Sequence, residues 1–294
     1  MSRTLRGILG LVFVVAAMVA AIVGLNDSWT SIWAITSELS WWRVVTPFIL
    51  VLAGVASTAL VWSRALARCG HPLPIRDAAP VFFVGQLGKY LPGSVWSIGA
   101  AALMLRRRAV PVSTSVAASL IFLLLHFAPG LATAGVLVLS GHTRLPEWWG
   151  FGIALAGLVT LAPQVMRPVG RFLNRAGAFD WSWSDALMVV ITMCAAWALY
   201  TGALFVTAPD ASWSAVPTLM AAFVLSFAAG VAVPFAPAGV GVREALLIYL
   251  LTPSLGFEVA AAVSLFSRVT HTVADLLLAG VSGAFSQLRR SEPT

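Results

Sequence analysis

Three side chains, Arg268, His271 and Asp275, carry charge or a titratable ring within a stretch that is otherwise apolar enough for a membrane interior. A charge at such depth costs about 2.5–3.5 kcal/mol on insertion scales, so these residues are expected to have a function. At roughly 100° per helical residue they share one face, within about 60°, with Ser264 and Ser282. This stripe predicts that Arg268 and His271 contact a phosphate, while Asp275 holds the histidine or balances the arginine. The alternative is an internal Arg–Asp pair that only fixes helix packing.

A proline-broken apolar segment, 232–244, precedes that helix and ends in Arg243 and Glu244. Gly239 and Gly241 let the backbone turn tightly before Arg243, which opens a short helical limb. Free N–H groups and the helix dipole at such a start attract anions, and a guanidinium suits phosphate or a carboxylate. We expect Arg243 to bind an anion, and Glu244 to pair with it or to bind a cationic headgroup. The alternative is that Arg243 and Glu244 only staple the turn.

Two further candidates lie in the first half of the chain. Lys89 occupies a glycine- and proline-rich break at 85–94 and is the counterpart of Arg243. His126 recurs at seven-residue spacing with Ser119 and Thr133, which places the three on one helix face. The alternative for His126 is an interior histidine whose hydrogen bonds are satisfied within the protein.

The composition predicts an all-α polytopic membrane protein. Of 294 residues, 60% are hydrophobic and only 10% are charged, and the mean hydropathy is +0.92. A soluble domain carries about 25% charged residues. Cys69 and Cys194 are far apart and predict neither a disulfide framework nor a zinc site. The net charge of +7 is explained by topology rather than by nucleic-acid binding, because no basic-aromatic platform accompanies it.

Apolar runs of about 20 residues predict six membrane-spanning helices. Two further apolar segments are broken into limbs too short to span, so we expect them to be re-entrant hairpins beside a wet cavity. The expected spanning helices are 7–25, 44–67, 113–139, 151–166, 185–206 and 259–285, and the expected hairpins are 78–105 and 215–251.

Arginine distribution predicts the orientation. Basic residues gather in the cytoplasmic loops of membrane proteins, and with both termini placed in the cytoplasm the outer loops keep only Arg43 and Arg144. The residues then on the inner side are Arg3, Arg6, Arg64, Arg68, Arg76, Arg106, Arg107, Arg108, Arg167, Arg171, Arg175, Arg289 and Arg290.

An offset of 145 residues superposes the two halves of the chain. Pro92 then falls on Pro237, and His126 falls on His271. We therefore expect one membrane domain, 1–294, made of two repeats at about 1–140 and 146–285. Each repeat contains three membrane crossings and a hairpin. Since three is an odd number, the second repeat is expected to be inverted, as in many transporters.

Enzymatic alternatives find less support in the sequence. The segment 85–90 lacks the spacing and the Ser or Thr of a nucleotide-phosphate loop, so we expect no built-in ATPase. His271 and Asp275 are only two obvious metal ligands, and no cofactor is expected. A triad of Ser264 or Ser267 with His271 and Asp275 would lie on a single helix without a visible oxyanion hole.

Two motifs, Gly88–Gly93 and Pro237–Ala245, resemble the signature stretches of the lysylphosphatidylglycerol synthase membrane-domain family, the flippase half of the multiple peptide resistance factors. The resemblance covers nearly the whole chain and implies a lipid flippase fold with paired re-entrant segments. Only 286–294 follow the last expected helix, so we expect the family's aminoacyl-transferring domain to be missing. Stand-alone relatives are expected to move other lipids, including polyprenyl-phosphate sugars.

Together these features predict a plasma-membrane translocase for an anionic lipid, either a phospholipid or a polyprenyl-phosphate-linked sugar. Its partner enzyme would be a lipid-modifying enzyme or a glycosyltransferase. One alternative is an intramembrane enzyme that acts on a lipid phosphate with His271 as base or nucleophile. The other is a secondary transporter of small anions.

Overall fold

Helices dominate the chain because apolar segments in hydrocarbon must satisfy their backbone groups internally. The structure, a computed structural model, describes residues 40–91, 96–175, 177–209, 211–233 and 236–291, and all its regular elements there are helical. The α-helices are α3 (Trp41–Arg68), α4 (Ile75–Gln86), α5 (Trp96–Arg106), α6 (Val112–Leu139), α7 (Glu147–Leu161), α8 (Pro163–Leu173), α9 (Trp183–Thr207), α10 (Val216–Ala232), α11 (Val242–Leu255) and α12 (Phe257–Ser291). Short 3-10 helices are η2 (Leu87–Tyr90), η3 (Trp213–Ala215) and η4 (Pro237–Gly239).

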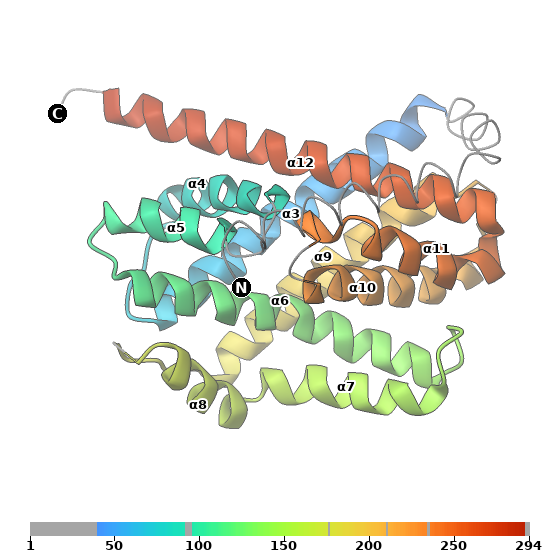
Figure 1. Cartoon of the computed structure of the whole chain (residues 1–294), viewed down its shortest axis with the longest axis horizontal. Coiled ribbons are helices and arrows are strands. Elements are labelled where there is room, and N and C mark those ends of the chain that lie inside the picture. Colours follow the sequence, from blue (N-terminus) through green and yellow to red (C-terminus); the bar gives the residue numbers. More distant parts are fainter. Residues whose placement is uncertain (1–39, 92–95, 176, 210, 234–235, 292–294) are drawn as a thin grey trace, which may run out of the picture.

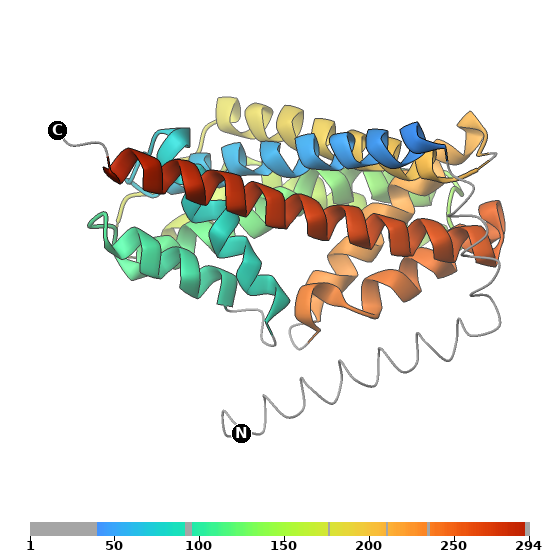
Figure 2. The ribbon, with the colours of Figure 1, turned by 90° about the horizontal axis from the view of Figure 1, so that it is seen from above.

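The long helices run along the longest axis of the molecule, and two helical hairpins fill the space beside them (Figure 1). The α4–α5 pair and the α10–α11 pair approach each other from opposite ends of that axis (Figure 2). Their tips meet near the middle, where η2 contacts η4. The two broken segments predicted from the sequence are therefore helical hairpins with facing tips.

Small residues let the limbs of each hairpin approach closely. A Cβ on Gly88 would lie 2.7 Å from the Cα of Ser97, and one on Gly239 would lie 2.8 Å from the Cα of Gly230. Gly239 also has a φ of +72°, which glycine adopts without steric cost. Ala238, beside it, has a φ of 48°. At the tip of the second hairpin, the backbones of Gly230 and Gly239 therefore lie close together, and Ala238 and Gly239 have left-handed backbone angles.

Six helices in the described ranges are long and apolar enough to cross a membrane, so the chain is an integral membrane protein. Four of them, α3, α6, α9 and α12, match predicted spans. The other two are the limbs of the second hairpin, and only their length and apolar composition make them candidates for membrane spans. The second of them is counted from Pro237 to Leu255 and includes η4. Its α-helical part, α11, has 14 residues and rises about 21 Å, less than the roughly 30 Å hydrocarbon core. The predicted first helix, 7–25, lies outside the described residues.

The predicted helix 151–166 is wrong in its bounds. Its place is taken by α7 and α8, which are bent by 71° relative to each other. Ala162 has an extended backbone (φ −65°, ψ 130°) because it precedes Pro163, and proline disfavours helical geometry in the residue before it. Together α7 and α8 are long and apolar enough to form one bent membrane span.

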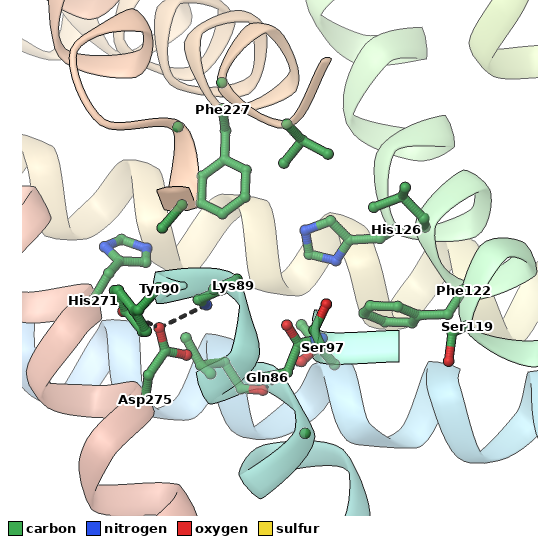
Figure 3. Close-up of a pocket in the computed structure, with 18 of the residues that line it drawn as sticks. Gln86, Lys89, Tyr90, Ser97, Ser119, Phe122, His126, Phe227, His271 and Asp275 are labelled. Carbon is green, nitrogen blue, oxygen red and sulfur yellow. Dashed lines mark hydrogen bonds and ion pairs between the residues drawn. The ribbon is translucent and has the colours of Figure 1, made fainter. Parts of the chain in front are cut away.

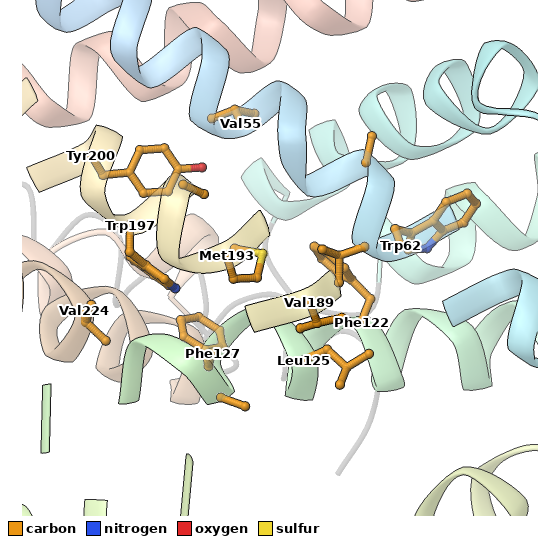
Figure 4. Close-up of a cluster of buried hydrophobic side chains, with 14 of the residues drawn as sticks. Val55, Trp62, Phe122, Leu125, Phe127, Val189, Met193, Trp197, Tyr200 and Val224 are labelled. Atoms are coloured by element: carbon orange, nitrogen blue, oxygen red, sulfur yellow. The ribbon is translucent and has the colours of Figure 1, made fainter. Parts of the chain in front are cut away.

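The apolar core lies where α3, α6, α9 and α10 meet (Figure 4). Trp62, Trp197 and Met193 are among its fully buried side chains. Helices α3 and α9 pack closely at Gly54, where an added Cβ would come within 3.0 Å of the Tyr200 ring. The Trp197 indole donates a hydrogen bond to the backbone oxygen of His126 at 3.2 Å, so α9 is also fixed to α6.

The described basic loops that were predicted to be cytoplasmic gather at one end of the long axis, with α8 and the end of α5 (left in Figure 1). There the buried carboxylate of Asp185 binds two arginines of α3. Its Oδ1 accepts from Nε of Arg64 at 2.6 Å and of Arg68 at 2.9 Å. Its Oδ2 accepts from the backbone and hydroxyl of Ser182, which closes a capping box at the start of α9. This cluster ties α3 to α9.

Candidate functional site

A cavity of about 370 Å³ lies between the two hairpin tips and the helices around them. Side chains from α3, α4, α5, α6, α9, α10, α11 and α12 line it, so both halves of the chain contribute (Figure 3). Its lining is mainly apolar, with a few polar groups that converge on the same space. This is the usual composition of a ligand-binding pocket.

Lys89 and Asp275 form an ion pair inside this cavity. The Nζ of Lys89, on η2, lies 2.6 Å from Oδ2 of Asp275 on α12. The hydroxyl of Tyr90 donates to the same oxygen at 2.7 Å. The first hairpin tip is therefore fastened to α12 by one carboxylate (Figure 3).

Arg268 fastens the second hairpin tip to the same helix. Its Nη1 donates to the backbone oxygen of Ala238 at 2.7 Å and lies 3.4 Å from Oε1 of Glu244. The other oxygen of Glu244 accepts from the backbone N–H of Gly241 at 2.6 Å. Glu244 thus caps the start of α11 and also binds Arg268.

Arg243 is a buried cation that forms no ion pair with a carboxylate among the described residues. Its side chain is at the start of α11, and the residue is 6% exposed. The guanidinium lies over the rings of Phe223 and Phe227, 5.0 and 4.4 Å from their centroids. Nη2 donates to the Ser267 hydroxyl at 3.2 Å. None of the ion pairs within the described ranges includes Arg243.

The two histidines face the cavity from opposite sides, with Phe227 between them (Figure 3). The ring centroid of Phe227 lies 6.0 Å from that of His126 and 6.2 Å from that of His271. Nδ1 of His271 bonds to the backbone oxygen of Ser267 at 2.8 Å. Nε2 of His271 and Nδ1 of His126 are buried and have no hydrogen-bond partner in the described part of the chain.

The charges that line the cavity in the described part of the chain are three cations, Lys89, Arg243 and Arg268, and one carboxylate, Asp275. Asp275 is already paired with Lys89. The balance is therefore positive, and a buried cation without a carboxylate partner favours an anionic ligand.

Six of the seven candidate residues chosen from the sequence line this cavity, and the seventh, Glu244, binds one of them. Ser119 also lines it. The other residues predicted to share a helix face with these candidates do not line it. Thr133 bonds to the backbone oxygen of Pro129, and the Ser264 hydroxyl is buried without a hydrogen-bond partner among the described residues. Ser282 lines a separate hollow near Arg108.

Two predicted pairings are not found. Asp275 binds Lys89 and Tyr90, and no hydrogen bond joins it to His271 or Arg268 within the described residues. Glu244 likewise binds Arg268 rather than Arg243. Each acid was expected to pair with a residue of its own helix. Instead, the partners of Asp275 are on η2, and the partner of Glu244 is on α12.

Sequence reasoning missed the aromatic half of the cavity, above all Tyr90, Tyr200 and Phe227. Tyr90 was visible beside Lys89 in the broken segment, and its hydroxyl was the available signal. Phe227 was not distinguishable from other core phenylalanines, because its importance comes from the two histidines on either side.

Metal or triad chemistry gains no geometric support. Across the ranges that the structure describes, no three His, Cys, Asp or Glu side chains are placed to hold a metal ion. The Ser267 hydroxyl accepts from Arg243, while its backbone oxygen, not its hydroxyl, contacts His271. In the described residues the Ser267 hydroxyl is therefore hydrogen-bonded to Arg243 and not to His271.

Comparison with known proteins identifies one family. Its model describes the lysylphosphatidylglycerol synthase TM region and matches residues 7–279. Among curated proteins, none matches the chain.

Proposed function

The chain belongs to the lysylphosphatidylglycerol synthase TM region family, and from this we propose that it moves a phosphate-bearing lipid between the two leaflets of a membrane. The lipid is a phospholipid or a polyprenyl-phosphate-linked sugar. Its headgroup passes through the cavity between the hairpins, while its tails stay in the bilayer.

The observation that carries this proposal is the state of Arg243. A guanidinium has five N–H donors, and among the described residues one hydrogen bond to Ser267 and two aromatic ring faces are the polar and cation–π contacts of this one. Leaving a buried charge without a counter-ion is costly. A lipid phosphate entering the cavity would supply that counter-ion and bind the planar donor fork in two places.

The packing of the helices supports two inverted repeats. The first limb of each hairpin contacts the last long helix of the other half, so α4 packs on α12 and α10 packs on α6. The long helices α3 and α9, which correspond in the two halves, pack on each other. Two halves related in this way can rock about the cavity between them, which gives alternating access.

Charge asymmetry supports the orientation. We infer from this that the end of the molecule that carries Arg64, Arg68 and Arg106–Arg108 faces the cytoplasm, and that the chain has a topology with both termini cytoplasmic. The protein acts in a plasma membrane without an ATPase of its own, and a lipid-modifying enzyme or a glycosyltransferase supplies or consumes its substrate.

Transport of a labelled lipid in liposomes tests the proposal. The protein is reconstituted with a trace of phosphatidylglycerol that carries a fluorophore on one tail, and dithionite is added outside. Fluorescence loss beyond the share in the outer leaflet measures translocation. Arg243→Ala is expected to slow it about tenfold to a hundredfold, since charge-assisted hydrogen bonds contribute about 1.5–3 kcal/mol.

The matched control is Arg171→Ala, which removes an exposed arginine of α8. It should transport at the rate of the unaltered protein. Arg243→Lys keeps the charge and should retain part of the activity, which separates loss of binding from misfolding. Full transport by monodisperse Arg243→Ala would refute the site. Chemical conversion of the lipid in detergent, where no leaflets exist, would favour an intramembrane enzyme.

A further inference from the structure

The cavity has an aromatic half that phosphate binding does not use. Among the side chains that line it, the ring centroids of Phe127 and Phe122 lie 4.9 and 5.4 Å from that of His126, and the ring of Tyr200 lies 5.0 Å from that of His271. Phe227 lies between the two histidines (Figure 3). A group that followed the phosphate into the cavity would therefore be enclosed by rings and by two imidazoles.

Both imidazoles have free hydrogen-bonding capacity toward that group. His126 is 8% exposed and His271 is 7% exposed. Each ring has a buried nitrogen for which the described residues provide no hydrogen-bond partner. The carbonyl of Ser267 can only accept, so Nδ1 of His271 carries the proton of that bond. In the neutral ring Nε2 is then an acceptor, and an acceptor suits a hydroxyl donor. Buried polar atoms in native proteins usually have partners, so these open positions indicate a ligand.

Ser267 connects this half of the cavity to the proposed phosphate position. Its hydroxyl accepts from Arg243 and its backbone oxygen accepts from His271. A phosphate held by Arg243 would therefore place its next substituent beside His271. Hydroxyl groups on that substituent could then donate to Nε2.

A cationic substituent would find no unpaired carboxylate among the charged groups of the described cavity. Its natural counter-ions, Asp275 and Glu244, are engaged by Lys89 and Arg268. Aromatic faces also attract cations, but two rings of the cavity, Phe227 and Tyr90, already have the guanidinium of Arg243 and the ammonium of Lys89 over them, at 4.4 and 5.5 Å from their centroids. Three cations line the cavity and would repel a fourth.

We infer that the lipid carried by this protein bears an uncharged, hydroxyl-rich group beyond its phosphate, such as a polyol or a sugar, and that a cationic aminoacyl headgroup is excluded. This inference rests on the proposed function. Arg243 binds the phosphate, and His126 and His271 bind the hydroxyl groups between aromatic walls.

Three tail-labelled lipids with identical tails test the inference in proteoliposomes. Phosphatidylglycerol has an uncharged hydroxyl-bearing headgroup, lysyl-phosphatidylglycerol adds positive charge, and phosphatidic acid ends at the phosphate. Phosphatidylglycerol is expected to move at least tenfold faster than its lysyl ester. Equal or faster transport of the lysyl ester would overturn the headgroup inference and leave the translocase proposal intact. If the protein moves none of the three, the translocase proposal itself fails.

Two variants identify the hydroxyl-binding groups. His126→Phe and His271→Phe keep an aromatic ring but remove its nitrogens. Each is expected to lower the ratio of the phosphatidylglycerol rate to the phosphatidic acid rate about tenfold. The control Tyr249→Phe loses a hydroxyl on the half-exposed side chain of α11 that lies against Arg144, outside the cavity, and should keep the ratio. His126→Phe breaks no hydrogen bond of the described residues, so it remains informative should His271→Phe fail to fold. An unchanged ratio in folded variants would overturn the inference.

Discussion

The carboxylate of Asp275 lies 2.6 Å from the ammonium of Lys89, although 186 residues separate them in the chain. Arg268, two helical turns before Asp275, binds the backbone oxygen of Ala238 at 2.7 Å. Helix α12 therefore holds the first hairpin tip with an anion and the second with a cation. Each tip is fastened to the same helix, and the cavity lies between the two contacts.

Lys89 and Asp275 are expected to depend on each other for stability. Lys89→Met or Asp275→Asn alone leaves an uncompensated charge in a poorly hydrated site, and each should cost about 2–3 kcal/mol. The double variant removes both charges, so its loss should be smaller than the sum by about 1–2 kcal/mol. Unfolding in mixed detergent micelles, followed by circular dichroism, measures the four proteins.

The ion pair between Arg108 and Asp77 provides a control, in which the two single variants and the double variant are compared in the same way. Its charged groups lie 3.2 Å apart, but both side chains are about 30% exposed. Water screens such a pair, so its coupling should stay below about 1 kcal/mol. Additive losses in the Lys89–Asp275 cycle would mean that the two charges are not coupled in the folded protein.

The sequence predicted these charged side chains but not their partners. Arg268, His271 and Asp275 were recognised because ionic groups in apolar segments are rare, and the broken segments were recognised from their glycines and prolines. Pairing was assigned along one helix, where spacing can be counted. The actual partner of Asp275 is set by the packing of a hairpin on α12, and no local pattern encodes that packing.

The basic end of the molecule gives a second example. Arg64 and Arg68 were predicted only as topological charges, yet both bind the buried carboxylate of Asp185. Asp185 was expected merely as the first residue of a helix. A buried acid that receives two arginines from a helix more than 100 residues earlier is visible only in the fold. The end of α7 was missed for a local reason, because the effect of Pro163 on Ala162 was overlooked.

Gly88→Ala is expected to disturb the first hairpin. The new Cβ would lie 2.7 Å from the Cα of Ser97, and backbone cannot move aside as a side chain can. Overpacking of this kind costs about 1–3 kcal/mol. Lipid transport should fall as well, because Lys89 and Tyr90 belong to the same short helix.

Gly99→Ala is the matched control, since nothing lies within 4 Å of a Cβ added there. Gly99 is inside α5, where alanine is favoured over glycine by about 0.5–1 kcal/mol. This variant should be as stable as the unaltered protein or more so. Equal melting temperatures for Gly88→Ala and Gly99→Ala would contradict the close approach of the two limbs.

Asp185→Asn is expected to loosen the contact between α3 and α9. The carboxylate is fully buried and binds two arginines that are each about one-third exposed. Allowing for that exposure, loss of its charge should cost about 2–3 kcal/mol. Asp180→Asn alters an acid whose side chain is 71% exposed and 3.5 Å from Arg167, so its effect should stay within about 0.5 kcal/mol. Melting temperatures in one detergent measure both, and similar values for the two variants would show that the buried cluster is not stabilising.

Cys69 is expected to be unreactive until the protein unfolds. It follows α3, is 1% exposed, and burial raises the pKa of its thiol from 9.0 to about 12. The thiolate is the reactive form, and at pH 8 a thiol with that pKa is about one part in 10⁴ thiolate. In a Cys194→Ala background, iodoacetamide at pH 8 should leave Cys69 intact in detergent and modify it in denaturant, as mass spectrometry would show. Rapid alkylation of the folded protein would place Cys69 in contact with water, against the packing of this end of α3.

The same thiol should make stability depend on pH. Because its pKa in the folded protein lies above that in the unfolded chain, the unfolded chain loses this proton first. The free energy of unfolding should therefore fall as pH rises from about 9 to about 12, and Cys69→Ala should lack that part of the loss.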